Sequence, residues 1–250
     1  MTHSEHEAEH SAQHFPSDPS PPQDKFDHAD LIQSAVRIDR AIKQRRDTDV
    51  QLVNWWLYFL LLSWITLGIY SIYLFFVRIS RIDNFSQRKH AYYSALLEWT
   101  GREAAARNRQ DIARQELADL GQHVSLAYQR ELRPIKAGLS FVLTLLTVGI
   151  YYFFVLYRLN RYWWDAQLVE QDFDDKLSQV WTKLGIINYP LNFEVDQHKR
   201  RSYPLYLILS LLTGGIWGAV WDYQIHTDPD NLFNEYHQVE DSVLQTVRSH

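Results

Sequence analysis

Cysteine is absent from the chain, and methionine occurs once in its 250 residues. Without cysteine the protein can form no disulfide, and it has no thiolate nucleophile or cysteine metal ligand. The sequence also lacks a phosphate-binding glycine loop, an H-E-x-x-H zinc motif and a G-x-S-x-G nucleophile motif. These absences favour a protein that is not an enzyme and that uses no cofactor.

A compact basic stretch of the kind that binds nucleic acid is also missing. The chain has 25 Lys and Arg against 30 Asp and Glu, for a formal net charge of -5. Aromatic residues instead gather near the ends of apolar segments, as Trp55, Trp56, Trp221 and Tyr223 do. Amphipathic rings in such positions are typical of the membrane interface. We therefore expect a lipid bilayer as partner and no nucleic acid.

Three apolar blocks, residues 53–77, 137–157 and 203–223, contain no Lys, Arg, Glu or His. They have 25, 21 and 21 residues, and about 20 apolar residues cross the ~30 Å hydrocarbon core as a helix. Only Asp222, at the end of the third block, is charged. Buried helices of a soluble protein are the alternative, which three uninterrupted blocks of this length disfavour. Because the first 30 residues are polar, we expect no cleavable signal peptide.

Each block contains one copy of the phrase S/T-x-x-T-x-G-I-Y/W, so the chain carries an internal repeat. The defining residues of the three copies are Ser63, Thr66, Gly68 and Tyr70, then Thr144, Thr147, Gly149 and Tyr151, then Ser210, Thr213, Gly215 and Trp217. On a continuous helix the first hydroxyl, the Thr and the aromatic share one face. Small hydroxyl residues and glycine allow close helix contact in lipid. We therefore predict that the phrase packs the three helices together; a hydroxyl-lined path or lipid site is the alternative.

Charges flanking the blocks leave their topology open. Asp83 and Asn84 lie 17 and 18 residues after Thr66, and Asp230 and Asn231 lie at the same distances after Thr213, which lengthens the repeat. Basic residues flank the first two blocks on both sides, and this conflicts with three straight spans under the positive-inside tendency. A turn at T-x-G would make re-entrant arms that reach half the core. We favour straight spans because the block lengths fit, and keep the turn as the alternative.

The fold class predicted is an all-α integral membrane protein, with three repeat-related hydrophobic helices, spanning or re-entrant, and amphipathic helices outside the membrane. The expected segments are a disordered His-, Pro- and acid-rich tail (1–29), a basic juxtamembrane helix (30–52), membrane repeat 1 (53–78), a polar helical insert (79–136), membrane repeat 2 (137–158), a polar helix and loop (159–202), membrane repeat 3 (203–223) and a C-terminal amphipathic helix (224–250).

Glycine and proline mark expected ends of helices. Gly101 is predicted to divide the insert into two helices, and Gly185 to end the helix that leaves the second block. The segment 189–195 alternates like a strand but has no partner strand, so a loop is expected. Thr227 and Pro229 predict the start of the last helix. His226, Asp228 and Asp230 could bind a cation, but capping acids at this helix start already explain them, so no metal site is predicted.

The phrase T-x-G-I-Y/W in short hydrophobic segments followed by basic residues resembles a family of small bacterial membrane domains of unknown function. The resemblance covers about a third of the chain and implies a multi-pass protein of the bacterial inner membrane, with no catalytic residue to carry over. Two functions fit the sequence. The first is a non-enzymatic membrane scaffold that binds a protein partner or forms a homo-oligomer; the second is an oligomeric channel or transport component with a Ser/Thr-lined helix face.

Overall fold

The computed structural model describes residues 28–191 and 193–250, in which every regular element is a helix, as expected. In chain order these are α1 (His28–Lys43), α2 (Arg45–Thr48), α3 (Trp55–Leu57), the π-helix η1 (Tyr58–Leu62), α4 (Ser63–Ile65), α5 (Ile69–Ala106), α6 (Gln110–Arg130), α7 (Ala137–Leu146), α8 (Ile150–Leu184), the 3-10 helix η2 (Gln197–Lys199), α9 (Tyr203–Leu212) and α10 (Ile216–Ser249). The tail predicted at 1–29 lies outside the described residues except for its last two, which begin α1.

Each apolar block is a helical hairpin that turns at T-x-G. The outgoing arms are the α3–η1–α4 run, α7 and α9, and the returning arms are the first turns of α5, α8 and α10. The preference for three straight spans was therefore wrong, because two consecutive left-handed residues end every outgoing helix. Among the described residues, no helix is both long enough and apolar enough to cross a membrane.

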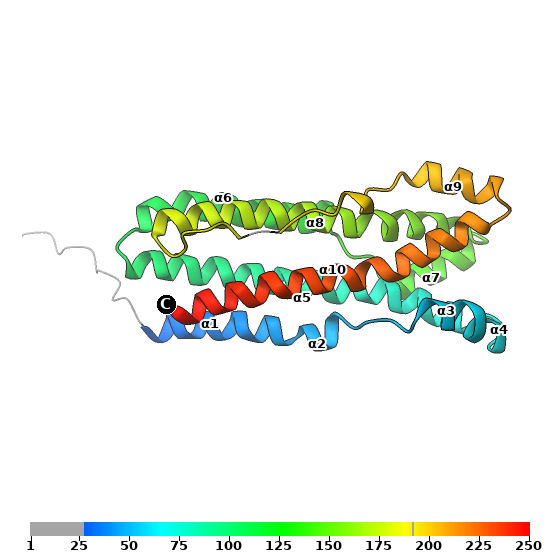
Figure 1. Ribbon diagram of the computed structural model, residues 1–250, viewed down its shortest axis with the longest axis horizontal. Helices are drawn as coiled ribbons and strands as arrows, with labels where there is room; N and C mark the ends of the chain where they lie inside the picture. The colour runs from blue at the N-terminus through cyan, green and yellow to red at the C-terminus, as the bar shows by residue number, and fades with distance from the viewer. Residues whose placement is uncertain (1–27, 192) are drawn as a thin grey trace, which may run out of the picture.

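The returning helices α5, α8 and α10 are long, with 38, 35 and 34 residues. They leave the hairpins in the same direction and run side by side to the opposite end of the molecule, where the C-terminus lies (Figure 1). The outer helices α1 and α6 pack along them. We call this part of the molecule the stalk, and the opposite part the hairpin end.

The three long helices are in register with one another. Leu96, Leu177 and Val243 each lie 30 residues after the Thr of their phrase, and all three side chains are fully buried. Because parallel helices of equal rise bring equal offsets to equal heights, the repeats contribute equivalent residues to each layer of the core. The internal repeat therefore continues well beyond the Asp-Asn pair at which the sequence similarity fades.

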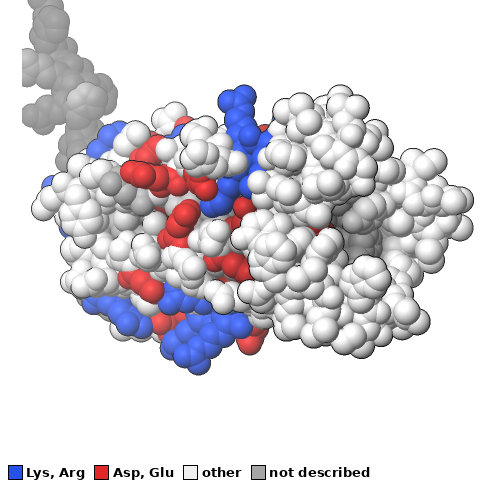
Figure 2. Space-filling view, turned by 45° about the vertical axis from the view of Figure 1, so that its right-hand side comes forward, with Lys and Arg blue, Asp and Glu red and all other residues white. Residues whose placement is uncertain are grey.

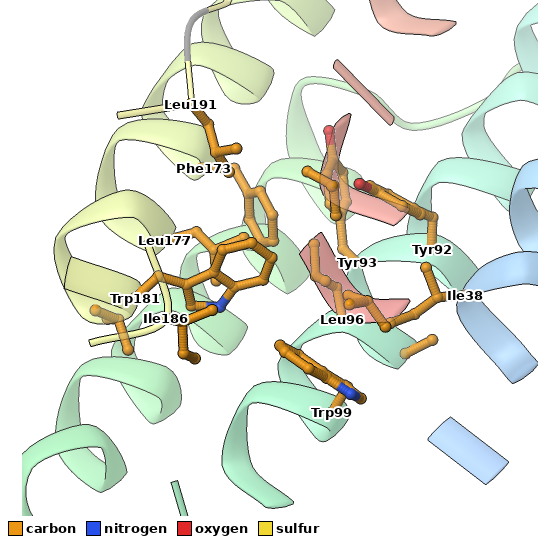
Figure 3. Packing of buried hydrophobic residues seen from close by; sticks show 14 of the residues in the cluster. Ile38, Tyr92, Tyr93, Leu96, Trp99, Phe173, Leu177, Trp181, Ile186 and Leu191 are labelled. Carbon is orange, nitrogen blue, oxygen red and sulfur yellow. The ribbon is translucent and has the colours of Figure 1, made fainter. Parts of the chain in front are cut away.

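The stalk core is apolar and aromatic (Figure 3). Tyr93 packs on Phe173 with ring centroids 4.3 Å apart, and Trp99 meets Trp181 edge-on at 5.6 Å. The indole Nε1 of Trp181 donates to Thr100 Oγ1 at 2.9 Å, so this buried polar atom is satisfied. Nearer the hairpins, Phe85, Trp163 and Phe233 form a triangle with one ring from each long helix.

Several predicted boundaries need correction. Gly101 lies inside α5, close to Leu117 of α6, and the chain turns instead at residues 107–109, where Asn108 has a φ of 53°. Pro229 lies inside α10 rather than at a helix start. By contrast, Gly185 ends α8 in the left-handed region, as predicted, and the described residues of 189–195 form no strand.

The basic segment 30–52 does not lie free beside the hairpins. Its helix α1 packs against α5, and Ile38, Ala41 and Ile42 are buried in the stalk core. The predicted helix over 30–52 is shorter in the structure, since α1 ends at Lys43 and only the short α2 follows before the non-helical residues 49–54, but α1 does have one apolar face. That face contacts the protein, because the long helix α5 extends far enough from the hairpin end to cover it.

Candidate functional site

The spacing of the phrase is the same in its three copies and builds the same turn three times, with the Thr hydroxyl at its centre. Thr147 Oγ1 donates to Leu143 O of the outgoing helix at 2.8 Å and accepts from Tyr151 N of the returning helix at 2.9 Å. Thr66 and Thr213 make the same pair of bonds. One side chain thereby gives a second hydrogen bond to a carbonyl of one helix, which already accepts the N–H of the same Thr, and satisfies a free amide of the next helix.

The backbone requires glycine two residues after this Thr, because φ is strongly positive there. The N–H of Gly149 donates to Thr144 O at 2.7 Å, which closes the outgoing helix as in a Schellman motif. Gly149 has a φ of 88°, and Val148 before it has a φ of 51°. A β-branched residue rarely adopts this conformation, yet Val148 stands at the tip of the second hairpin.

The phrase does not form the predicted seam between three helices, because it ends one helix and begins another. Ser63 Oγ lies 3.3 Å from Ser71 Oγ of the returning arm, and Thr144 and Ser210 donate to carbonyls of their own helices. In the first and third copies the aromatic residue contacts the outgoing arm of its own hairpin, Tyr70 against Tyr58 and Trp217 against Tyr206. Each copy of the phrase therefore holds one hairpin together.

The hairpin tips are strongly apolar and exposed. Leu67 and Val148 are 93% and 92% exposed. Further large apolar side chains that are more than two-thirds exposed surround them: Trp64, Ile65, Ile69, Leu146, Ile150, Leu211, Leu212 and Ile216. Figure 2 shows this end of the molecule free of Lys, Arg, Asp and Glu, which are confined to the stalk side. Contiguous apolar surface of this kind marks an interaction site with protein or membrane.

A buried charged group closes the base of the hairpins. Arg78 of α5 binds Asp222 of α10 through two bonds of 2.5 and 3.1 Å, and Trp55 Nε1 donates to the same carboxylate at 2.9 Å. Arg78 also donates to His226 Nδ1, whose Nε2 donates to Val53 O at 2.7 Å. The single charge in the apolar blocks is thus neutralised by a bidentate partner from another repeat.

His226, Asp228 and Asp230 do not converge on a cation position. Asp228 pairs with Arg201, Asp230 pairs with Arg81, and His226 contacts Arg78. They also lie in the interior of α10, so they are not the capping acids of a helix start. Within residues 28–191 and 193–250, no three His, Asp or Glu side chains are grouped to hold a metal ion.

A second buried ionic cluster lies inside the stalk. Arg88 binds both Asp49 and Glu240, and Lys89 binds both Glu170 and Glu240 at 2.6 and 3.1 Å. Each of these side chains is at most 1% exposed. Burial opposes the ionised form of Asp49, but the hydrogen bond from His237 and the charge of Arg88 outweigh it and lower the pKa of this carboxyl.

Asp174 lies beside this cluster without a share in its ion pairs. Its side chain is buried, and Oδ2 has no hydrogen-bond partner among the described residues. Burial, with the nearby charge of Glu170, raises the pKa of Asp174 well above its ordinary value. Asp174 lies 27 residues after its phrase Thr, as Tyr93 and Glu240 do in the other repeats, so the three helices bring these positions together.

Comparison of the chain with protein families, with curated protein sequences and with solved structures gave no match. The sequence offered a turn at T-x-G only as the alternative to straight spans, and it predicted neither ionic group, because the members of each group are far apart along the chain. The signal for the first was Asp222, a lone acid at the edge of an apolar block, whose partner Arg78 stands at the exit of another block.

Proposed function

We propose that the protein is a membrane-anchored helical scaffold whose three hairpins enter one leaflet of the bilayer. One observation carries this proposal: three apolar tips, each on its own turn, lie exposed at the same end of one molecule. Burying such surface in hydrocarbon is favourable by roughly 25 cal/mol per Å². The repeated turn keeps the backbone N–H groups of each tip bonded, which favours burial of the tip in lipid.

Hairpin length supports insertion into one leaflet. The arms α7 and α9 have ten residues each, so they extend about 15 Å at 1.5 Å per residue. This is half of the ~30 Å hydrocarbon core. Arg78 and Asp222 at the base, with Trp55 beside them, would then lie at the level of the headgroups. Tryptophan is enriched at that level.

The polar remainder of the chain would then stand on one side of the membrane. Because each block begins and ends at its base, the basic residues that flank all three blocks fall on the same side. The positive-inside tendency makes this the cytoplasmic side, at the bacterial inner membrane that the family resemblance implies. The stalk would present α1 and α6 to a protein partner or to a second copy of the chain.

The channel hypothesis has less support. It needs the hydroxyls of Thr66, Thr147 and Thr213 to line a path, but each already bonds two backbone groups of its own hairpin. Arms of ten residues also leave the far leaflet uncrossed. A scaffold anchored in one leaflet needs neither free threonine hydroxyls nor arms that cross both leaflets.

Vesicle flotation tests the anchor with a matched pair of triple variants. Leu67→Asp, Val148→Asp and Ile216→Asp place three charges at the tips, where each opposes burial in hydrocarbon by about 2.5–3.5 kcal/mol at the bilayer centre. We expect at least a hundredfold loss of binding to phosphatidylethanolamine–phosphatidylglycerol vesicles. Ile32→Asp, Ile112→Asp and Leu168→Asp remove exposed apolar residues from the stalk instead. Equal loss in both variants, with helicity retained by circular dichroism, would contradict the anchor.

A further inference from the structure

Two apolar cavities lie between the three hairpins. The larger, of about 470 Å³, opens between the first turns of α8 and the third hairpin, with Phe153, Leu207 and Gly218 among its walls. The smaller, of about 260 Å³, lies between the first and second hairpins. In Figure 2 a hollow divides the apolar end of the molecule. Both volumes suit chain-like apolar ligands better than water, because little of their lining is polar.

The two cavities meet at a polar point. Tyr152 and Asp222 line both of them, and Arg78 lines the smaller one beside Asp222. Asp222 already accepts three hydrogen bonds, from Arg78 and Trp55. Arg78 is 8% exposed, and its Nε–H has no hydrogen-bond partner among the described residues. A buried guanidinium donor left unpaired is unfavourable, so this position calls for an acceptor oxygen.

We propose that one phospholipid of the surrounding leaflet occupies both cavities, with one acyl chain in each and a phosphate or ester oxygen accepting from Arg78 Nε. This inference rests on the insertion of the hairpins proposed above. The orientation agrees with that insertion, since Arg78 lies at the base, at headgroup level, and the apolar walls extend from it toward the tips. A two-chain lipid fits two cavities that share one polar junction, whereas a fatty acid would fill one.

Native mass spectrometry of the full-length protein, purified in mild detergent with palmitoyl-oleoyl phosphatidylglycerol added, tests the site. Leu207→Trp fills the larger cavity, and Leu205→Trp adds the same ring to an exposed position of the same helix. We expect one retained phospholipid in the wild type and in Leu205→Trp. We expect at least a tenfold lower occupancy in Leu207→Trp.

Arg78→Lys tests the polar junction. Lysine keeps a cation for Asp222 but removes the Nε donor, so we expect a loss of phospholipid affinity of about tenfold, the scale of one charged hydrogen bond. Thermal unfolding of the same variant shows whether the ion pair still holds the base together. Unchanged affinity in Arg78→Lys would overturn the assignment of the headgroup to Arg78.

Further outcomes separate this inference from the anchor. Flotation without any retained phospholipid would overturn the lipid site and leave the anchor standing. Retained phospholipid without flotation would overturn the anchor and leave the site standing. Displacement of the lipid by palmitic acid in a ratio of one to one would replace the two-chain occupant with a fatty acid and overturn the proposal. Equal effects of the two tryptophan variants would place the lipid outside the larger cavity.

Discussion

Thr147 shows why all three copies of the phrase have threonine at this position. Its hydroxyl donates to the last turn of one helix and accepts from the first turn of the next, so one oxygen serves two helices. Serine can make both bonds, but valine, of nearly equal volume, can make neither. The phrase therefore specifies the hydrogen bonds of a turn, and the hydroxyl is the part of threonine that this turn requires.

Thr147→Val should lower the free energy of unfolding by about 1–2 kcal/mol, the scale measured for loss of a helix cap. Thr147→Ser should recover most of this loss, because it restores the hydroxyl. Thermal unfolding followed by circular dichroism in mild detergent measures both changes. If the valine and serine variants were equally destabilised, the hydroxyl would not be the group that matters.

Val148 is held in an unfavourable backbone conformation at a fully apolar tip. A left-handed β-branched residue is strained by roughly 1–2 kcal/mol, whereas asparagine visits this region with little penalty. Val148→Asn should therefore raise the free energy of unfolding by about 1 kcal/mol and, at the same time, weaken vesicle binding. Val142→Asn, at a half-exposed helical position of the same hairpin, should weaken binding without the gain in stability.

Opposite changes in stability and binding would show why valine stands at this tip. The strained residue would be retained because lipid, and not the fold, selects an apolar side chain there. A Val148→Asn variant with lower stability than wild type would contradict this account of the tip.

At the scale of the element, the sequence indicates the position at which each hairpin can turn. Apolar length, glycine and threonine showed where each block could turn, and the flanking charges were consistent with a turn. The length of the blocks favoured a straight span. A criterion that counts apolar residues takes no account of whether the backbone angle φ is negative or positive. The helix ends because two consecutive residues, such as Val148 and Gly149, have a positive φ. Valine rarely adopts a positive φ, so its presence in the sequence does not predict this turn.

The ionic layers between the long helices could not be read from the sequence for a different reason. Lys89 and Glu170 are 81 residues apart, and nothing local pairs them. They do stand at the same distance after their phrase Thr, as does Tyr236. Once the helices are known to run in parallel, this equality predicts that they meet. The three long helices run in parallel only because each block turns back as a hairpin. Straight spans would make neighbouring helices antiparallel, so that topology does not predict these ion pairs.

Asp174→Asn tests this layer through its pH dependence. The raised pKa of Asp174 means that the folded state holds a proton more tightly than the unfolded state, whose pKa is near 3.8. Stability is therefore fully present below about pH 4 and is lost as the pH rises through the higher folded pKa. Asparagine carries no proton to lose, so the variant should be more stable than wild type at pH 7, by on the order of 1 kcal/mol.

The difference between Asp174→Asn and wild type should shrink as the pH is lowered from 7 to 4, because both then carry a neutral side chain. Denaturant unfolding at a series of pH values measures it. Asp119→Asn, at an exposed position of α6, is the matched control and should show no such trend. A constant difference across the pH range would mean that the carboxyl of Asp174 is ionised in the folded protein.

At the scale of the whole molecule, the absence of native cysteine makes topology directly measurable. Single cysteines can be placed at the exposed stalk positions Ser94, Gln179 and Ser249, one on the stalk part of each long helix. If every hairpin turns within one leaflet, all three should react with an impermeant thiol reagent from the same side of oriented vesicles. Three straight spans would instead put the second cysteine on the side opposite to the first.

Two further cysteines, at Leu67 and Val148, test the depth of the hairpins in the same vesicles. Both tips should resist the impermeant reagent from either side and become reactive after detergent is added, because a tip about 15 Å from its base ends near the bilayer centre. Reaction of the tips from the side opposite to the stalk would show that the hairpins cross the membrane. Reaction from the stalk side without detergent would show that the tips stay in water. Protection of both tips, with all stalk cysteines on one side, is the pattern that only a hairpin anchor in a single leaflet produces.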